Sequence, residues 1–358
     1  MRILHLLAGA PAGGAETFAL DAIEALSERG IEQHVIARPH PMLVERLAAA
    51  AVPLTPASFS RLSVLLGARR KIARAAEQFG AQLIHAWMGR AASFVPETRP
   101  CPALGWFGGY YHLRRFRAVD WFTGVTPDIA AHIERSGAPA SRVSVVHTFG
   151  TLAAAAALDR AVLGVPPSAT LLLVLSRMHQ KKGIDTLLQA LVRLPGVHLL
   201  LAGSGPRQAA YEKLARSLGV GDRAHFLGWR TDRAALLATA DVCILPSRYE
   251  PFGTVIAEAW AARRPLVATN AQGARQFVTD GETGLVVPID DEAALAAAVA
   301  RLIADPALCL RLVENGHAAY RAQFDRDVVT EGMISNYDRA IAAGKKKGSL
   351  LNRNSISC

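Results

Sequence analysis

The chain has few cysteines, no metal-ligating cluster and no long apolar run. Its four cysteines lie far apart and form no C-x-x-C pair, so neither a disulfide framework nor a cysteine-bound metal is indicated: Cys101, Cys243, Cys309 and Cys358. No His/Asp cluster suggests another metal site. No segment approaches the roughly 20 apolar residues that a membrane span needs, so any membrane contact is expected to be peripheral. These absences favour a globular protein of the reducing cytoplasm.

Composition and charge narrow the choice further. A length of 358 residues favours two domains, and 51% hydrophobic against 20% charged residues is typical of globular chains. Forty Lys and Arg against thirty Asp and Glu give a net charge of +10 and a pI of about 9.8. This balance favours an anionic partner such as a nucleic acid, a lipid surface or a nucleotide. Part of the excess lies in "GKKKGSLLNRNSISC", and we expect residues 345–358 to form a disordered tail.

Short apolar runs alternate with amphipathic stretches along almost the whole chain, which predicts parallel strands joined by crossover helices. The start "MRILHLLAGAPAGGAE" has one Arg and an apolar run broken by His5, so it is read as a buried first strand and not as a signal peptide. Strands are expected at "RILHLLA", "EQHVIAR", "AQLIHAW", "PALGWF", "WFTGVT" and "VSVVHTF", then at "TLLLVLS", "VHLLLAG", "AHFLGW", "DVCILPS", "PLVAT" and "TGLVVP". Helices are expected at "AETFALDAIEALSERG" and "SVLLGARRKIARAAEQFG".

The fold class is therefore α/β, with two doubly wound, Rossmann-like domains that face a cleft. A composition shift at residues 150–169, with a Pro pair, predicts the linker between them. The first domain is expected to span 1–150, and a helix at about 326–344 is expected to pack back on it. The second is expected to span 151–325. Ligands of such folds bind beyond the carboxyl ends of the strands, so the loops there are the candidate site.

The first of these loops is glycine-rich. "LAGAPAGGAETF" places Gly9, Gly13 and Gly14 between the first strand and the first helix, where backbone amides could approach a phosphate. Such a turn is also common in α/β proteins without a ligand. The spacing is not G-x-G-x-x-G, and no acidic residue ends the second strand, which argues against a nicotinamide enzyme.

The second loop, "LVLSRMHQKKGIDTLLQAL", carries Arg177, Lys181 and Lys182 just before a helix that starts near Gly183. Cations at a helix N-terminus oppose the helix dipole and ordinarily weaken the helix. A bound diphosphate would reverse this penalty, whereas the alternative is a solvated cluster of charges. The position at the carboxyl end of a strand favours the diphosphate.

The third loop is "PSRYEPFGTVIAEAW", in which a helix is predicted to open just after Gly253. Four backbone amides at the helix start suit a sugar or phosphate oxygen, those of Phe252, Gly253, Thr254 and Val255. Glu258, about one turn into the helix, could accept hydrogen bonds from a ribose diol. In the alternative interpretation Glu250 is a surface residue and Glu258 a charge favoured by the dipole.

Taken together, the loops resemble the retaining GT-B glycosyltransferases of group 1, of the bacterial cell-surface polysaccharide and lipopolysaccharide type. The resemblance covers nearly the whole chain: "GGAE" at 13–16, "SRMHQKKGIDTLLQAL" at 176–191, "LLLAGSGP" at 199–206 and "YEPFGTVIAEAWAARRPLVATNAQGARQFVTDGETGLVVP" at 249–288. The E-x7-E signature with its EPFG context is specific, and the other motifs would be weak alone.

The resemblance implies a role for each matching residue. Arg177 and Lys182 would neutralise the donor phosphates, and Glu250 would position the transferred sugar. His85, in "LIHAWMGRAASF" at a strand end, would lie beside that sugar, although an isolated histidine is more often structural. The donor would be held by Gly13, Gly14, Gly203, Ser204, Phe252, Gly253, Thr254, Val255 and Glu258, with Gly203 and Ser204 near the base and Glu258 on the ribose.

The resemblance also implies the reaction: transfer of a sugar from a nucleoside diphosphate donor, with a UDP-sugar favoured, and with retention at the anomeric carbon. No metal and no cofactor are expected. The acceptor is expected to be a cell-surface glycan, either lipopolysaccharide core or a lipid-linked saccharide. The alternatives are a nucleotide-sugar epimerase or hydrolase of the same fold, or a basic nucleic-acid-binding protein. For the last, no recognisable module or aromatic platform is present, so no nucleic-acid partner is expected.

The segment "GWFGGYYHLRRFR", residues 105–117, follows a strand of the first domain and is our candidate acceptor site. Tyr110 and Tyr111 could pack against sugar rings, and Arg114 and Arg115 could bind an anionic acceptor and the anionic inner membrane. The alternative is an amphipathic helix with buried aromatic residues and solvated arginines. The protein is expected in the cytoplasm, with a peripheral inner-membrane contact. Thr148 stands where relatives often have Asn.

Overall fold

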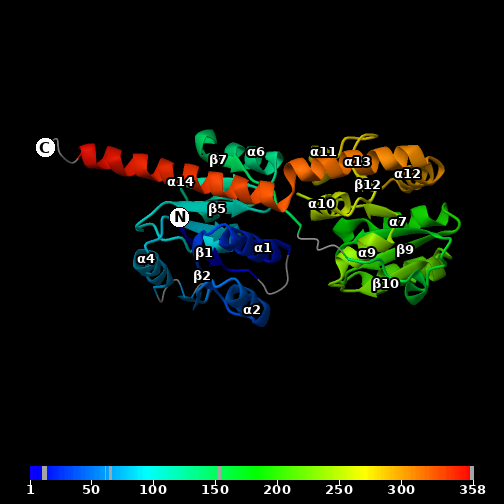
Figure 1. Ribbon diagram of the computed structural model, residues 1–358, viewed down its shortest axis with the longest axis horizontal. Helices are drawn as coiled ribbons and strands as arrows, with labels where there is room; N and C mark the ends of the chain where they lie inside the picture. The colour runs from blue at the N-terminus through cyan, green and yellow to red at the C-terminus, as the bar shows by residue number, and fades with distance from the viewer. Residues whose placement is uncertain (10–13, 61, 64–66, 151–154, 355–358) are drawn as a thin grey trace. The chain divides into compact units, whose positions relative to one another are not determined.

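The structure is a computed structural model that describes residues 1–9, 14–60, 62–63, 67–150 and 155–354 (Figure 1). The chain divides into two compact units. Unit 1 consists of Met1–Phe149 and Arg326–Cys358, and unit 2 consists of Gly150–Asp325. Each unit contains one parallel sheet with helices on its faces, so the two doubly wound domains expected from the sequence are confirmed.

Unit 1 contains a seven-stranded sheet in the order β3-β2-β1-β4-β5-β6-β7, with every neighbouring pair parallel. The six strands predicted for this half all form. The sequence reading missed β3, which is only three residues long and ends in Pro56 at the sheet edge, where proline costs no ladder hydrogen bond. The strands are β1 (Arg2–Leu7), β2 (Glu32–Ala37), β3 (Leu54–Pro56), β4 (Leu83–Trp87), β5 (Ala103–Phe107), β6 (Trp121–Gly124) and β7 (Val143–Val145).

The helices of unit 1 include one that starts later than expected. The stretch 63–80 was predicted to be a single helix, but α4 begins after Gly67, whose left-handed φ of 79° is incompatible with a continuous helix. The helical segments are α1 (Gly14–Glu28), α2 (Pro41–Ala49), α4 (Ala68–Phe79), α5 (Met88–Ala92), η1 (Leu113–Phe116), α6 (Pro127–Arg135), η2 (Ala140–Arg142) and α14 (Arg326–Asn354).

Helix α14 runs through part of the stretch 345–358, for which a disordered tail was expected. Its backbone continues through Gly344 and the three lysines to Asn354, and residues 355–358 lie outside the described part. Lysine is a good helix former, and a helix that is already nucleated extends at little cost. Along its docked part α14 lies beside the sheet of unit 1 and packs against α1, β4 and β5 (Figure 1).

Buried hydrogen bonds fix α14 on this sheet. Asn336, which is 1% exposed, donates to Thr123 Oγ1 at 2.8 Å and accepts from Trp121 Nε1 at 2.9 Å. The phenol of Tyr337, also 1% exposed, shares a 2.7 Å hydrogen bond with His85 Nδ1. These bonds satisfy polar groups whose burial would otherwise be costly, so they specify where the helix docks.

Unit 2 contains a six-stranded parallel sheet in the order β10-β9-β8-β11-β12-β13, and all six strands predicted for this half form. The strands are β8 (Thr170–Leu175), β9 (Val197–Ala202), β10 (Ala224–Gly228), β11 (Val242–Leu245), β12 (Leu266–Thr269) and β13 (Leu285–Val287). The helical segments are η3 (Arg160–Leu163), η4 (Gln180–Lys182), α7 (Ile184–Val192), α8 (Gln208–Ser217), η5 (Gly221–Arg223), α9 (Arg233–Thr239), α10 (Thr254–Ala261), α11 (Gln272–Phe277), α12 (Glu292–Ala304) and α13 (Pro306–Gln323).

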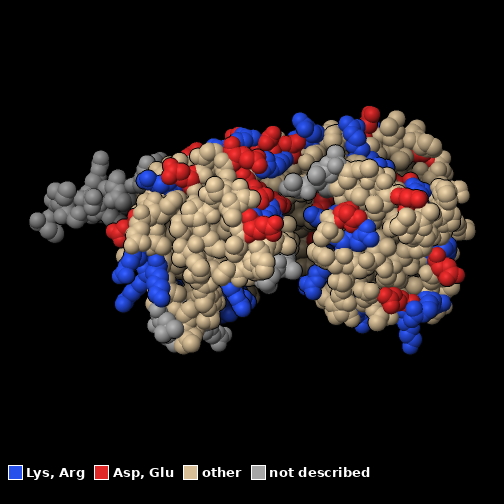
Figure 2. All heavy atoms as spheres, turned by 60° about the horizontal axis from the view of Figure 1, so that its bottom comes forward, with Lys and Arg blue, Asp and Glu red and all other residues tan. Residues whose placement is uncertain are grey.

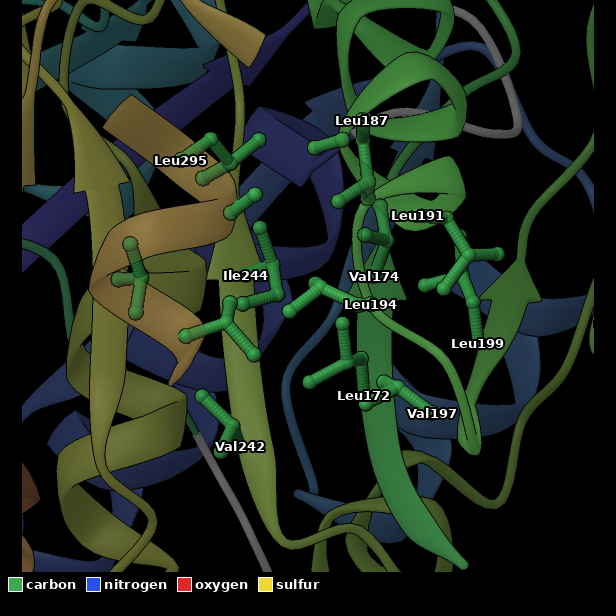
Figure 3. Close-up of a cluster of buried hydrophobic side chains, with 14 of the residues drawn as sticks. Leu172, Val174, Leu187, Leu191, Leu194, Val197, Leu199, Val242, Ile244 and Leu295 are labelled. Carbon is green, nitrogen blue, oxygen red and sulfur yellow. The ribbon is translucent and has the colours of Figure 1, made fainter. Parts of the chain in front are cut away.

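The core of unit 2 explains why its strands are apolar without alternation. Five apolar side chains that are at most 1% exposed pack together (Figure 3): Leu172 and Val174 of β8, Ile244 of β11, and Leu187 and Leu191 of α7. The other face of the sheet is covered as well, because the alternate residues of β8 are also buried. A parallel sheet with both faces covered buries every strand position, which gives continuous apolar runs.

Both sheets reverse their strand order beside the first strand. In unit 1 the switch lies between β1 and β4, and in unit 2 between β8 and β11. At such a switch the loops that follow the two strands diverge, and a crevice opens at their carboxyl ends. The cationic loop follows β8 and the two-glutamate loop follows β11, so the fold brings the two most informative motifs together.

Candidate active site

The loop after β8 is held against the loop after β11 by backbone contacts. Gly183 has a left-handed φ of 61°, and a Cβ there would lie 2.0 Å from the carbonyl oxygen of Pro246. The amide of Arg248 donates to the carbonyl of Lys181 at 2.8 Å. Only glycine allows this approach, so the glycine that separates the lysines from α7 keeps the two loops in register.

Lys182 and Glu250 form the central ion pair of the site. Lys182 Nζ donates to Glu250 Oε2 at 2.5 Å, and the side chains are 23% and 15% exposed. Ser247 Oγ lies 3.4 Å from the same carboxylate oxygen. Arg177, five residues earlier in the loop after β8, is exposed and forms no ion pair with any described residue. The loop after β8 therefore offers three cations to an incoming anion: Lys182, which is paired with Glu250, and Arg177 and Lys181, which form no ion pair with any described residue.

Gly273 of α11 holds the turn at 250–253 in place. The amide of Gly273 donates to the carbonyl of Glu250 at 2.7 Å, and a Cβ on Gly273 would lie 2.1 Å from the carbonyl oxygen of Phe252. Phe252 points into the core against Phe277, with ring centroids 5.3 Å apart. Gly253 then adopts φ 86° as the N-cap of α10, as the sequence predicts. The backbone is thus rigid where the first amides of α10 lack intrahelical partners.

Glu258 lies on the buried side of α10. It is 2% exposed, and its Oε1 accepts a hydrogen bond from Arg233, the first residue of α9. Arg233 itself is 43% exposed. A carboxylate this deeply buried needs a cation or hydrogen-bond donors close by, and Arg233 supplies both.

The loop after β9 completes this edge. Gly203 adopts φ 143°, and a Cβ there would lie 1.9 Å from the carbonyl oxygen of Ser176. Its amide donates to Gly228 at 2.7 Å, and Ser204 accepts from the amide of Met178 through its carbonyl at 3.0 Å. Gly203 is buried and Ser204 is exposed. The ends of β8, β9 and β10 are therefore bound into one surface.

The expected phosphate loop of unit 1 is described only in part. Gly13 lies outside the described residues. Gly14 begins α1, and a Cβ there would meet nothing within 4 Å. A Cβ on Gly9 would lie 1.7 Å from Glu16 Oε1, so the glutamate of "GGAE" packs over this glycine.

The sequence of the chain matches two glycosyltransferase profiles. That of the Glycosyl transferases group 1 family matches residues 156–319, and that of Glycosyltransferase Family 4 matches residues 12–149. The chain is 35% identical over 338 residues to the lipopolysaccharide core biosynthesis glycosyltransferase LpsE of Rhizobium meliloti, which covers 93% of this chain and 98% of LpsE. The chain belongs to the group 1 glycosyltransferases.

Two further relatives agree with this family. LpsD of Rhizobium meliloti, also a lipopolysaccharide core biosynthesis glycosyltransferase, is 32% identical, with 96% of this chain and 99% of LpsD covered. The crystal structure of Anabaena Alr3699/HepE in complex with UDP-glucose superposes with a TM-score of 0.80 at 22% identity, covering 94% of this chain and 99% of that one. The GT-B fold expected for this glycosyltransferase is therefore confirmed.

The expected position of His85 was wrong. The glycosyltransferase carries it in the middle of β4, 0% exposed, and not at the strand end. Its ring is stacked on Trp87 at 4.0 Å, and burial together with the neighbouring His5 holds its pKa well below the usual value for histidine. The true end of β4 is Trp87, two residues later. The imidazole has no exposed surface and its Nδ1 is bonded to Tyr337, and its role beside the donor sugar stays a prediction.

The segment 105–117 is not an amphipathic α-helix. It leaves β5 and forms only the short η1, in which Phe116 is 1% exposed and stacks on Phe107 at 3.8 Å. The Tyr110 hydroxyl donates to Asp128, and Tyr111 stacks on Phe116 at 6.4 Å, so both tyrosine rings are already half-buried. The exposed residues here are His112, Arg114, Arg115 and Arg117.

Sequence reading missed two arginines of the candidate site. Arg233 was not predicted because its partner Glu258 is 25 positions away. Arg248 binds Asp185 through two hydrogen bonds of 2.9 Å and Asp290 through one of 2.6 Å, which ties the loop after β11 to α7. For Arg248, the only signal in the sequence was its charge inside the motif "PSRYEPFG".

Within the described ranges no group of three His, Cys, Asp or Glu residues is arranged to hold a metal ion. Among the same residues no single helix is long and apolar enough to cross a membrane. The helices 292–304 and 306–344 pass that test only as a pair, bent by 102°.

Proposed function

We propose that this glycosyltransferase moves a sugar from a UDP-sugar to a lipopolysaccharide core acceptor, with retention at the anomeric carbon and without a metal or other cofactor. Two relatives matched over almost their full length are lipopolysaccharide core biosynthesis glycosyltransferases, which supports the acceptor class. The similar fold of HepE was solved with UDP-glucose, which supports the donor class. The proposal rests chiefly on the cationic edge of unit 2, where Arg177 and the Lys182–Glu250 pair lie at the switch point.

In the proposed mechanism, the donor diphosphate lies against Arg177 and Lys182. These cations are arranged before reaction, so they stabilise the negative charge that grows on the leaving diphosphate without reorganisation. Lys182 Nζ then donates a hydrogen bond to a phosphate oxygen, and its interaction with Glu250 weakens. Glu250 and the amides of Phe252, Gly253 and Thr254 hold the transferred sugar. Retention follows if the acceptor oxygen attacks on the leaving-group face and its proton passes to the departing phosphate.

The nucleoside would be held by the remaining residues of the same edge. Glu258 offers an ionised carboxylate, which accepts hydrogen bonds at both oxygens and therefore suits the two ribose hydroxyls. The base would lie near Gly203 and Ser204, and the amide of Val255 would add a donor at the helix start.

A peripheral contact with the anionic face of the inner membrane is the second part of the proposal, and it implies a cytoplasmic protein. Five arginines of unit 1, here called the arginine surface, support it: Arg69, Arg70, Arg74, Arg114 and Arg115. Arg69 lines two hollows, one of about 850 Å³ with Arg70 and Arg74 and one of about 430 Å³ with Arg114 and Arg115. None of the five forms an ion pair with any described residue, and Figure 2 shows blue side chains gathered where unit 1 carries α4. Each such cation adds about 1 kcal/mol near an anionic bilayer.

The test is a panel of nucleotide sugars. The purified protein is incubated with UDP-, GDP- and ADP-linked hexoses, with and without truncated lipopolysaccharide, and transfer is measured by mass spectrometry of the product. We expect transfer from a UDP-sugar that EDTA does not reduce. Transfer from none of these donors to any truncated core would contradict the proposal. Sedimentation with anionic liposomes, compared between wild type and Arg70→Gln/Arg74→Gln, tests the membrane contact.

A further inference from the structure

Unit 1 has a hollow at its own topological switch point. The hollow has a volume of about 660 Å³ and is lined by residues that follow β1, β2 and β3 and by the start of α5, which follows β4. Gly9, Arg38, Ser58 and Arg90 contribute to its wall. This volume is within the usual range of ligand sites, about 300 to 1,000 Å³, and the carboxyl edge beside the switch is where open α/β sheets bind ligands.

The charge of this hollow is positive. Arg38 and Arg90 are both exposed, and neither forms an ion pair with any described residue. The carboxylate of Glu16 packs over Gly9 but is not paired with Arg38 in the described part of the chain. Arginines are commonly paired or solvated along a surface, whereas here two from different elements, the loop after β2 and helix α5, line one concavity. Their guanidinium groups can each bind an oxyanion through two parallel hydrogen bonds.

The backbone at the end of β4 is strained beside this hollow. Met88 adopts a φ of 64°, a left-handed conformation that is uncommon for a side chain of this size. It is the first residue of α5, so this turn sets the direction in which the helix carrying Arg90 leaves the sheet. Backbone strain persists only where the surroundings impose it, and it clusters at binding sites. The strain and the unpaired arginine thus occur within three residues of each other.

We propose that Arg38 and Arg90 bind an oxyanion of the acceptor, a phosphate monoester or a carboxylate on its sugar part. This inference rests on the proposed function, because it treats the hollow as the acceptor subsite of the glycosyltransferase. It differs from the arginine surface in place: that surface follows α4 and η1, whereas this hollow lies at the switch point. A concave pair of guanidiniums selects a discrete anionic group.

The experiment measures binding directly, so it does not depend on turnover. The probe is the core oligosaccharide released from truncated lipopolysaccharide by mild acid, titrated by calorimetry into protein saturated with UDP. It is used in three forms: intact, treated with phosphatase, and with its carboxylates reduced to alcohols. The proteins are wild type, Arg38→Gln/Arg90→Gln, Arg38→Lys/Arg90→Lys, Arg114→Gln/Arg115→Gln and Arg301→Gln/Arg311→Gln. The last removes the same charge from exposed sites of unit 2.

We expect the Arg38→Gln/Arg90→Gln variant to bind the intact probe at least tenfold more weakly than wild type, with partial recovery in the lysine variant and an unchanged Kd for UDP. Wild type should bind one of the two modified probes more weakly than the intact probe, by a similar factor. The Arg38→Gln/Arg90→Gln variant should bind that modified probe no more weakly than it binds the intact one. Whichever modification has this effect identifies the phosphate or the carboxylate as the ligand.

Three results would overturn the inference: equal binding of the intact probe by the glutamine variant and wild type, an equal loss in the unit 2 control, or no binding by wild type. If only Arg114→Gln/Arg115→Gln lost affinity, the anion would bind at the arginine surface and the inference would also fail. Transfer from a UDP-sugar is assayed in parallel. If wild type binds the oligosaccharide through Arg38 and Arg90 but transfers no sugar to it, the proposed function is wrong and the anion subsite is still supported.

Discussion

Replacing Glu258 by Gln should weaken nucleotide binding while keeping the fold. The side chain is 2% exposed within α10, and Gln has almost the same shape, so the packing against β11 and β12 is preserved. What changes is the charge. A neutral amide offers one acceptor oxygen in place of two ionised ones, so a ribose diol loses at least one charge-assisted hydrogen bond.

The proposed ribose diol and Arg233 are the two partners of the Glu258 carboxylate, and the loss at each gives the expected changes in UDP affinity and in stability. Loss of a hydrogen bond to a charged group costs about 1.5 to 3 kcal/mol, which corresponds to a Kd for UDP raised about 10- to 150-fold. The Arg233 pair is also weakened, but this arginine is 43% exposed and regains water. The free energy of unfolding should therefore fall by no more than about 1 kcal/mol.

Calorimetric titration with UDP and with 2′-deoxy-UDP checks the assignment. Wild type should prefer the ribonucleotide, and Glu258→Gln should lose most of that preference. Glu314→Gln, which removes an exposed carboxylate of the same unit, serves as the matched control. An unchanged Kd for UDP in Glu258→Gln, with the ribose preference intact, would refute the reasoning.

Three further predictions concern catalysis, pH and the docking of α14. Arg177→Ala and Lys182→Ala should each lower kcat by a larger factor than they raise the donor Kd, because the charge they meet is greatest in the transition state; activity lost on chelation and restored by a divalent ion would contradict the metal-free mechanism. His5 is buried, which lowers its pKa to about 3, so the unfolded chain binds more protons below about pH 6.5. Stability should fall by about 1.4 kcal/mol per pH unit from this group as the pH drops from about 6.5 towards 3, and His5→Gln should reduce that slope in urea titrations. Asn336→Ala should destabilise unit 1 by about 1 to 3 kcal/mol, because it leaves Trp121 Nε1 with one hydrogen-bond partner fewer; an unchanged urea midpoint would show that α14 docks without it.

The edge of unit 2 was largely predictable because its chemistry is local in sequence. Gly183 and Gly253 each mark the residue before a helix, and the strands before them are unbroken apolar runs. Once parallel strands are assumed, the loops after β8 and β11 must meet at one edge. The Lys182–Glu250 pair then follows from topology, although the two residues are 68 positions apart and the sequence between them carries no sign of the contact.

The features that were missed depend on partners that are distant in sequence. His85 was expected at a strand end, but its place is set by pairing with β1 and by Tyr337, 252 residues later. The run before α4 looked continuously helical, and the left-handed Gly67 breaks it. Arg38 is a single charge in the loop after β2 and Arg90 a single charge in α5, and only the strand order brings them to one hollow.

The central claim is that the cationic edge of unit 2 carries out sugar transfer with retention. Its most direct test is the anomeric configuration of the first product. Proton NMR of the reaction is followed from the start, with α-linked UDP-glucose, or whichever UDP-hexose the panel selects, and truncated lipopolysaccharide core oligosaccharide as acceptor. The account predicts a new anomeric signal with the small coupling of an α-linked sugar and its loss in Lys182→Ala. A β-linked product, or full activity in that variant, would contradict it.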